Sequence, residues 1–229
     1  MSRNSNITSI ETISCDAGWR NYYFVKITTT GDVVGWSEYD ESFGPKGVTQ
    51  NINIMGVELI GQSVLNHESI YNQLFRKKRG MFGGVVVQAM GAIENALLDA
   101  KAKLLGLPCY ELLGGKLRDV IRVYWSHCGP WRMKPRAQYY CDKELESLSD
   151  IEKLAFEARQ SGFNALKTYP YYLNKVGEMR MWSPGFGQPF QPDLNFDRKF
   201  LRDLRDYLEA FRKGAGPDMD IMLDLNFNA

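Results

Sequence analysis

Histidine and cysteine, two residues that often bind transition metals, are scarce in this sequence. The 229 residues include only two histidines, His67 and His127, which are too few for a metal site built from histidine. Four cysteines are present, without the close pairwise spacing of a zinc site: Cys15, Cys109, Cys128 and Cys141. Nothing indicates secretion, so we expect reduced thiols in a cytoplasmic protein.

An excess of charge of either sign is also missing. There are 28 basic and 27 acidic residues, and the longest basic run is the four residues 76–79. This balance excludes the electrostatic footprint of a nucleic-acid-binding protein. No apolar stretch approaches the ~18 residues that span a membrane, and the polar start MSRNSNITSI is unlike a signal peptide. Because 44% of the residues are apolar, a sizeable core is expected.

The first half of the sequence has strand patterns followed by helix patterns. Three segments are rich in β-branched and aromatic residues, which is typical of strands: 7–14, 22–30 and 33–38. Gly31-Asp32 marks a tight turn between the last two. Residues 48–113 are helical in pattern, most clearly at 87–105, where apolar residues recur every three or four positions. Residues 1–115 are therefore predicted to form an α+β domain.

The second half alternates between strands and helices. The sequence predicts a strand at 120–125, a helix started by a capping box at Ser149–Glu152, a strand at 165–168, a helix at 196–213 and a strand at 219–223. Such alternation indicates a parallel sheet with crossover helices. The strand-to-helix links, 127–148 and 170–195, are long, as in a (β/α) barrel with its site at that end. A doubly wound sheet is the rival, but no Gly-rich phosphate loop follows a strand.

Polar side chains follow each of the three predicted strands. His127 follows the first, and Asp224 and Asn226 follow the third. Lys167 and Tyr169 lie at the end of the second, on one side of it because side chains alternate along a strand. We expect these groups to converge at one edge of the sheet. Asp224 suits a hard divalent cation, and a partly desolvated lysine can bind a substrate carboxylate.

Each of these residues also has a simpler interpretation. A lysine at a strand end is often a solvated residue of the rim, and an aspartate there often caps the next helix. A tyrosine after a lysine commonly packs, and a single histidine in a loop commonly makes a structural hydrogen bond. The site prediction therefore depends on the convergence of the residues rather than on any one of them.

Three stretches resemble the mandelate racemase and muconate lactonizing branch of the enolase superfamily. They are GAIENALLDAKAKLLGLPCYELLGGKLRDVIRVY, ALKTYP and LDLNFN. The first is similar to the helix that joins the family's capping domain to its barrel. The resemblance implies an α+β capping domain (1–115) followed by part of a TIM-like (β/α)7β barrel (116–229). It also implies removal of a proton α to a carboxylate, with Mg²⁺ stabilising the enediolate.

The resemblance implies roles for individual residues. Asp224 would be the first of three carboxylate ligands to Mg²⁺, and Lys167 would face the substrate carboxylate. Tyr169 stands where many relatives have a lysine base, and some acid-sugar dehydratases of the branch have tyrosine there. A neutral phenol is a poor base unless a cation lowers its pKa.

Three further residues are expected to bind substrate. Trp19 lies in the segment Cys15–Arg20, which resembles the loop that closes over substrate in the family. Asn226 stands at a position that is asparagine in some relatives and histidine in others. His127 follows the first predicted barrel strand.

The expected function is that of an Mg²⁺-dependent acid-sugar dehydratase acting on a small carboxylate. A racemase or epimerase is the first alternative and a non-catalytic remnant the second. We also expect a homo-oligomer. The sequence ends after the third predicted barrel strand, so we expect an N-terminal portion of an enzyme, inert by itself and with 219–223 as an open sheet edge.

Overall fold

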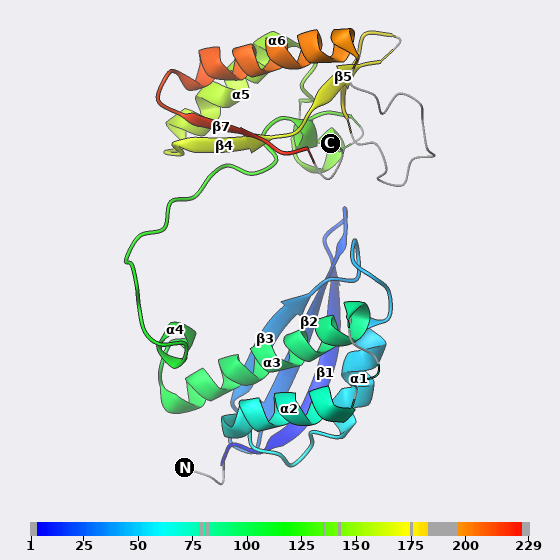
Figure 1. The fold of residues 1–229 in the computed structure, drawn as a ribbon, viewed down its shortest axis with the longest axis vertical. Helices are drawn as coiled ribbons and strands as arrows, with labels where there is room; N and C mark the ends of the chain where they lie inside the picture. Colours follow the sequence, from blue (N-terminus) through cyan, green and yellow to red (C-terminus); the bar gives the residue numbers. More distant parts are fainter. Residues whose placement is uncertain are drawn as a thin grey trace. The chain divides into compact units, whose positions relative to one another are not determined.

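The structure, a computed structural model, describes residues 4–77, 80, 83–134, 136–141, 143–174, 176–182 and 197–225. Contacts within the chain divide it into two compact units, residues 1–119 and 120–229. Figure 1 shows the helices and strands of each unit.

The first unit is built on an antiparallel sheet with strand order β1-β2-β3. Its strands are β1 (Ile7–Asp16), β2 (Asn21–Thr29) and β3 (Val34–Tyr39). The β2–β3 turn has Asp32 in the left-handed region at φ 58°, which aspartate tolerates better than most residues. The three predicted strands and the turn are confirmed.

Helices cover one face of this sheet (Figure 1). They are α1 (Val48–Val57), the 3₁₀ turn η2 (Val64–Asn66), α2 (His67–Lys77) and α3 (Gly84–Leu105). The short helix α4 (Cys109–Leu112) follows α3 and contacts it. The predicted apolar stripe of α3 is buried, notably at Ala89, Ile93, Ala96, Leu97 and Ala100. Gly106, at φ 67°, ends the helix as predicted. The start at Gly84 precedes the predicted one by three residues.

The sheet and α3 approach each other closely at Gly35. A Cβ atom there would lie 2.1 Å from the carbonyl oxygen of Ala96. Two polar contacts flank this point: the Trp36 N–H donates to Asp99 Oδ2 at 2.8 Å, and Ser37 Oγ donates to the Ala92 carbonyl at 2.6 Å. Only glycine permits this spacing, because any side chain would meet backbone of the helix.

The second unit contains a short parallel sheet with β4 at its centre. β4 (Ala165–Thr168) pairs in parallel with β7 (Asp220–Leu223), and Trp125 makes a parallel bridge to Leu166 on the other side. The bridge is formed when the Lys167 N–H donates to the Trp125 carbonyl at 2.8 Å. The described residues thus form an open parallel sheet of three segments.

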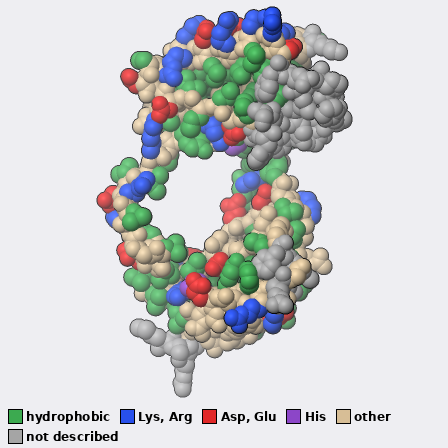
Figure 2. Space-filling view, viewed as in Figure 1, with side chains coloured by type: hydrophobic (Ala, Val, Ile, Leu, Met, Phe, Trp, Pro, Cys, Tyr) green, Lys and Arg blue, Asp and Glu red, His purple; other side chains and the backbone are tan. Residues whose placement is uncertain are grey.

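Two helices, α5 (Leu148–Gln160) and α6 (Arg198–Ala215), pack together on one side of β4 and β7 (Figure 1). Buried side chains join helices and sheet, including Ile151, Leu154, Leu166, Tyr207 and Phe211. Figure 2 shows basic side chains gathered over α6. The exposed basic residues of this helix are Arg198, Lys199, Arg202, Arg205, Arg212 and Lys213. The helix is therefore amphipathic, as its sequence predicts.

The predicted strand at 120–125 is wrong except at its end. Trp125 lies opposite Leu166, the second residue of β4, so the residues before Tyr124 extend past the beginning of that strand. Arg122 uses its side chain instead, donating to Asn164 Oδ1 at 2.8 Å and pairing with Asp220 at 2.6 Å. Because β4 is short, most of the segment 120–125 has no partner strand for backbone hydrogen bonds.

Two other sequence predictions need correction. The capping box of α5 is formed by Ser147 and Asp150, not by Ser149–Glu152: the Asp150 N–H donates to Ser147 Oγ at 3.3 Å, and Ser147 Oγ donates to Asp150 Oδ2 at 2.7 Å. The link expected as a loop at 170–195 contains a hairpin, β5 (Tyr171–Leu173) and β6 (Met179–Met181). The other short elements are the 3₁₀ turns η3 (Pro130–Arg132) and η4 (Ala137–Tyr139).

Among the helices that the structure describes, none has both the length and the apolar composition needed to cross a lipid bilayer.

Gly35→Ala is expected to destabilise the first unit. The new methyl group would meet the Ala96 carbonyl of α3, and overpacking of this kind costs about 1–3 kcal/mol. Gly91→Ala is the control, because a Cβ at this position of the same helix meets open space and alanine favours helix by up to ~1 kcal/mol. Urea unfolding followed by circular dichroism compares them. Equal midpoints for the two variants would show that the contact at Gly35 is not a tight one.

Candidate active site

The candidate site lies at the carboxyl ends of the parallel segments in the second unit. Along β4, Leu166 is fully buried in the core with α5 and α6, and Thr168 Oγ1 lies 2.8 Å from the hydroxyl of Tyr207 on α6. Because side chains alternate along a strand, Lys167 and Tyr169 lie on the opposite face, away from the helices. Lys167 and Tyr169 thus lie on the same side of the chain, as the sequence predicts.

Lys167 and Asp224 form an ion pair across neighbouring strands. Lys167 Nζ lies 3.1 Å from Asp224 Oδ2, and both side chains are partly buried. Asp224 follows β7, where its N–H donates to the Thr168 carbonyl at 2.9 Å. Burial lowers the pKa of Lys167, but Asp224 and Tyr169 raise it more, so the pKa lies above its ordinary value. Lys167 is therefore a cation at neutral pH.

Tyr169 is a protonated phenol in this environment. Its side chain is buried, with 5% of the residue exposed, and this burial raises the pKa of Tyr169 above its ordinary value. The positive charge of Lys167 lowers the pKa and the negative charge of Asp224 raises it, and burial is the largest of these effects. Tyr169 can therefore donate a hydrogen bond, but it is not a base at neutral pH.

His127 is held at the same edge by aromatic packing. Its ring centre is 3.9 Å from that of Trp131 and 5.2 Å from that of Tyr169, and its Nδ1 lies 2.8 Å from Ser126 Oγ. Its backbone has φ 56°, uncommon for a residue with a side chain. Burial, followed by the positive charges of Lys167 and Arg136, lowers the pKa of His127 to about 4. The imidazole is therefore neutral at physiological pH.

The sequence interpretation missed three residues of this site. Tyr124 places its ring 5.4 Å from Lys167 Nζ, and the guanidinium of Arg136 lies over the ring of Trp131 at 5.6 Å. The length of the link 127–148 predicted a site at this end of the sheet, but the individual contacts of the link depend on how the chain folds back. The position of Tyr124 next to Trp125, which pairs with β4, is the signal that could have identified it.

The remaining predicted residues are placed elsewhere. Trp19 belongs to the first unit, where its ring packs with Tyr22 at 6.3 Å and Phe43 at 5.9 Å between ring centres. The guanidinium of Arg20 lies 4.8 Å from the Trp19 ring centre and 4.0 Å from that of Tyr22. Trp19 is thus held in an aromatic cluster with a cation. Asn226 lies outside the described residues.

The described residues by themselves do not make a complete magnesium site. Within them, no group of three or more histidine, cysteine, aspartate or glutamate side chains is arranged to hold a metal ion. Asp224 is one carboxylate, and it pairs with the ammonium of Lys167. Mg²⁺ needs near-ideal octahedral coordination, so a single carboxylate is a partial fit at most.

Comparison with known proteins gives consistent matches. Residues 5–114 match the N-terminal domain of mandelate racemase/muconate lactonizing enzymes. The D-xylonate dehydratase of Haloferax volcanii is 32% identical over 158 residues, which cover 68% of this chain and 36% of that protein. The D-galactonate dehydratase of Pectobacterium atrosepticum is 35% identical over 173 residues, 76% of this chain and 39% of that protein.

Two solved structures are more similar, and one of them contains ligands. It is described as a "putative L-alanine-DL-glutamate epimerase from Burkholderia xenovorans strain LB400 bound to magnesium and fumarate", with 53% identity and a TM-score of 0.90. The match covers 98% of this chain and 55% of that one. The chain therefore spans about half the length, or less, of the proteins that it matches here. By its N-terminal domain, its fold and these relatives, the chain belongs to the mandelate racemase/muconate lactonizing enzyme branch of the enolase superfamily.

Proposed function

We propose that this protein acts as an Mg²⁺-dependent acid-sugar dehydratase. The observation that carries the proposal is the meeting of Lys167, Asp224 and Tyr169 at the ends of adjacent parallel strands, on the face away from the helices. The names of the curated relatives support the substrate class, since those proteins are called dehydratases of D-xylonate and D-galactonate. The substrate would be a small sugar acid.

The wider architecture belongs to the same proposal. The segment at Trp125, β4 and β7 would be the first three strands of a (β/α)7β barrel, within residues 116–229. Residues 1–115 would be the capping domain. The parallel order of the three segments and the helices on one face are what such a barrel requires. We also expect the protein to form a homo-oligomer, which light scattering on the purified protein can test.

The charges of the site favour binding of a carboxylate. Lys167 remains a cation and would hold the carboxylate group of the substrate as negative charge builds up on it. Tyr169 remains protonated and would donate a hydrogen bond to the same region. Because neither group is unprotonated at neutral pH, neither would remove the α-proton in its resting state. The base is therefore expected from another part of the protein.

His127 would serve as a neutral hydrogen-bonding partner for substrate hydroxyls. Its pKa of about 4 keeps the ring uncharged beside Lys167 and Arg136. Trp19, in the first unit, remains a proposed substrate-binding residue on the basis of its sequence resemblance. Asn226 remains a proposed substrate-binding residue on the basis of the sequence alone.

Asp224 would be one of several ligands to Mg²⁺. A bound Mg²⁺ would supply stabilisation of the negative charge on the substrate carboxylate. One carboxylate at a strand end is a position that such a ligand can take, and the related structure from B. xenovorans is described as bound to magnesium. Among the described residues, Asp224 is not part of a group of three or more such side chains that could hold the ion.

Epimerisation is the second candidate function. The 53%-identical structure is described as an L-alanine-DL-glutamate epimerase, and its ligand, fumarate, is a dicarboxylate. An epimerase adds and removes the α-proton on both faces, so it requires a base on each side. The names of the curated relatives, which are dehydratases of sugar acids, favour dehydration. A third possibility, a non-catalytic protein that kept the fold, predicts no turnover.

The complete gene product should dehydrate at least one member of a panel of C5 and C6 sugar acids, in the presence of Mg²⁺. Asp224→Asn should abolish this Mg²⁺-dependent turnover, because the substitution removes a charged ligand. Asp218→Asn, at an exposed position, is the control and should leave turnover unchanged. Proton exchange at the α-carbon of a dipeptide, without dehydration of any sugar acid, would instead favour epimerisation. No turnover on either panel would favour the non-catalytic alternative.

Lys167→Met should reduce activity by ~10²-fold or more, as losses of positioned acid–base groups do. The reason is the loss of the cation that faces the substrate carboxylate. Lys153→Met is the matched control, since Lys153 is 72% exposed and lies on α5. Steady-state kinetics on both variants give the comparison. Equal kcat/KM values for the two variants would show that Lys167 does not contribute to the reaction.

The ring of His127 should titrate near pH 4, far below the ordinary value of 6.5. Proton NMR can follow it directly, because the chain has only two histidines and His67→Gln removes the other signal. A histidine whose folded pKa is lowered stabilises the protein above pH 6.5, and this contribution is lost as the pH falls towards 4. Stability measured in urea should therefore decrease over this range. A His127 midpoint near 6.5 would contradict the burial of the ring beside Lys167.

A further inference from the structure

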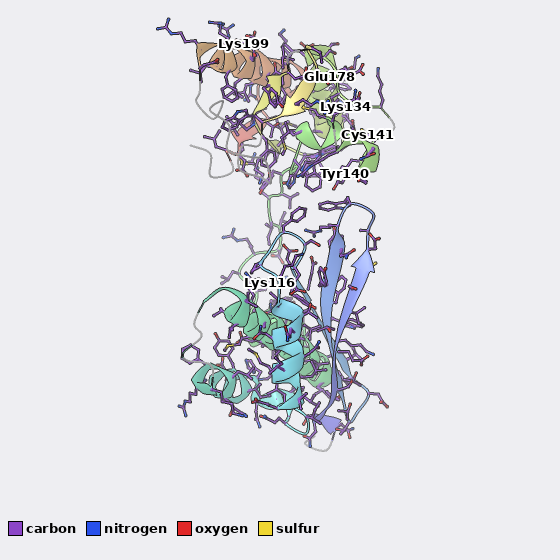
Figure 3. All side chains as sticks on the ribbon, turned by 90° about the vertical axis from the view of Figure 1, so that its right-hand side faces the viewer. Lys116, Lys134, Tyr140, Cys141, Glu178 and Lys199 are labelled. Carbon is purple, nitrogen blue, oxygen red and sulfur yellow. The ribbon has the colours of Figure 1, made fainter. Side chains whose placement is uncertain are left out.

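An ion-pair network around Lys134 joins two loops of the second unit. Lys134 lies between η3 and η4, and its Nζ is 3.0 Å from Glu144 Oε1 and 3.3 Å from Glu178 Oε1. Glu178 precedes β6 in the hairpin that follows β4. Figure 3 shows Lys134 and Glu178 next to each other in this unit. A parallel backbone bridge between Lys134 and Arg180 adds to the connection.

Glu178 is held firmly by its own hairpin. Its Oε2 accepts hydrogen bonds from Asn174 Nδ2 at 2.8 Å and from the guanidinium of Arg180 at 2.7 Å. These donors, together with Lys134, lower the pKa of Glu178 to about 2. The carboxylate is thus charged at every pH at which the protein would work, and it presents a fixed partner to Lys134.

The loop that Lys134 anchors carries two residues of the candidate site. Trp131, which packs against His127 with 3.9 Å between ring centres, precedes Lys134 by three residues. Arg136, which lies over Trp131 and acts on the charge of His127, follows it by two. Met133, between Trp131 and Lys134, is fully buried, so the loop is fixed on its inner side as well. A displacement of the backbone at Lys134 would therefore also move Trp131 and Arg136.

A second anchor holds the other side of this loop. Arg132 makes two hydrogen bonds to Glu157 of α5, at 2.7 and 2.9 Å. The loop is thus attached to α5 through Arg132 and to the β5–β6 hairpin through Lys134. Exposed ion pairs contribute little to global stability. Loss of the Lys134 contact should consequently move the loop without unfolding the unit.

We propose that Lys134 is a positioning residue, which through Glu178 sets the placement of Trp131 and Arg136, and thereby of His127, in the candidate site. The role in substrate binding rests on the proposed function, whereas the structural coupling does not. Lys134 itself is directed to the hairpin and is not expected to contact substrate.

The test uses the His127 ring as a reporter, since its proton resonances depend on stacking with Trp131. Lys134→Met and Glu178→Gln should each shift the His127 resonances in the same direction, and the double variant should shift them no further. Lys134→Arg should restore the wild-type positions, because arginine can make the same ion pair. Urea midpoints should be close to that of the wild type in all of these variants.

Lys213→Met is the matched control, because Lys213 also joins two elements of this unit, pairing with Glu152 at 3.4 Å. It should leave the His127 resonances in place. Unchanged resonances in both Lys134→Met and Glu178→Gln would overturn the proposal, as would unfolding of both variants or an equal shift in Lys213→Met. If the proposed reaction is found, kcat should fall by up to about 10²-fold in Lys134→Met, as expected for a misplaced site residue. An absence of that reaction would count against the proposed function alone, because the NMR comparison does not require turnover.

Discussion

The hydrogen bonding of β4 on both of its edges is the constraint on which the candidate site depends. On one edge the Lys167 N–H donates to the Trp125 carbonyl, and on the other the Asp224 N–H donates to the Thr168 carbonyl. Because both pairings are parallel, the residues that follow the three segments leave the sheet at the same edge. A lysine, a carboxylate and a neutral imidazole from distant parts of the sequence thus meet there. Because side chains alternate along β4, Leu166 and Thr168 point to the opposite face, into the layer of helices.

Burial and charge together set the protonation states at this edge. Burial works against the positive charge of Lys167, but Asp224 and Tyr169 together outweigh it and raise the pKa of the lysine. Burial and the neighbouring cations act in the same direction on His127, which is neutral as a result. Tyr169 keeps its proton because burial outweighs the effect of the lysine. The outcome is a cation that is paired with Asp224 and flanked by two neutral hydrogen-bonding groups, Tyr169 and His127.

Loops in both units are held by side chains that bind backbone or ionic partners. In the first unit, Asp40 accepts hydrogen bonds from the N–H groups of Ser42 and Gly44, at 2.8 and 3.0 Å, next to the Phe43 ring that packs on Trp19. In the second, Glu178 plays the corresponding part for the loop of Trp131. Residues proposed to bind substrate are therefore carried on loops with specific internal support, as precise positioning requires.

The sequence by itself determined the elements whose cause is local. The alternation in β1 to β3, the apolar stripe of α3 and its glycine cap all follow from neighbouring residues, and so does the shared side of Lys167 and Tyr169. The local pattern could not decide whether 120–125 forms a strand, because its pairing depends on where β4 begins. It also could not decide which of two serines, Ser147 or Ser149, caps α5. Only the tertiary structure brought Tyr124, Trp131 and Arg136 to Lys167 and His127, since contacts between distant loops depend on packing and charge that no short stretch of sequence contains.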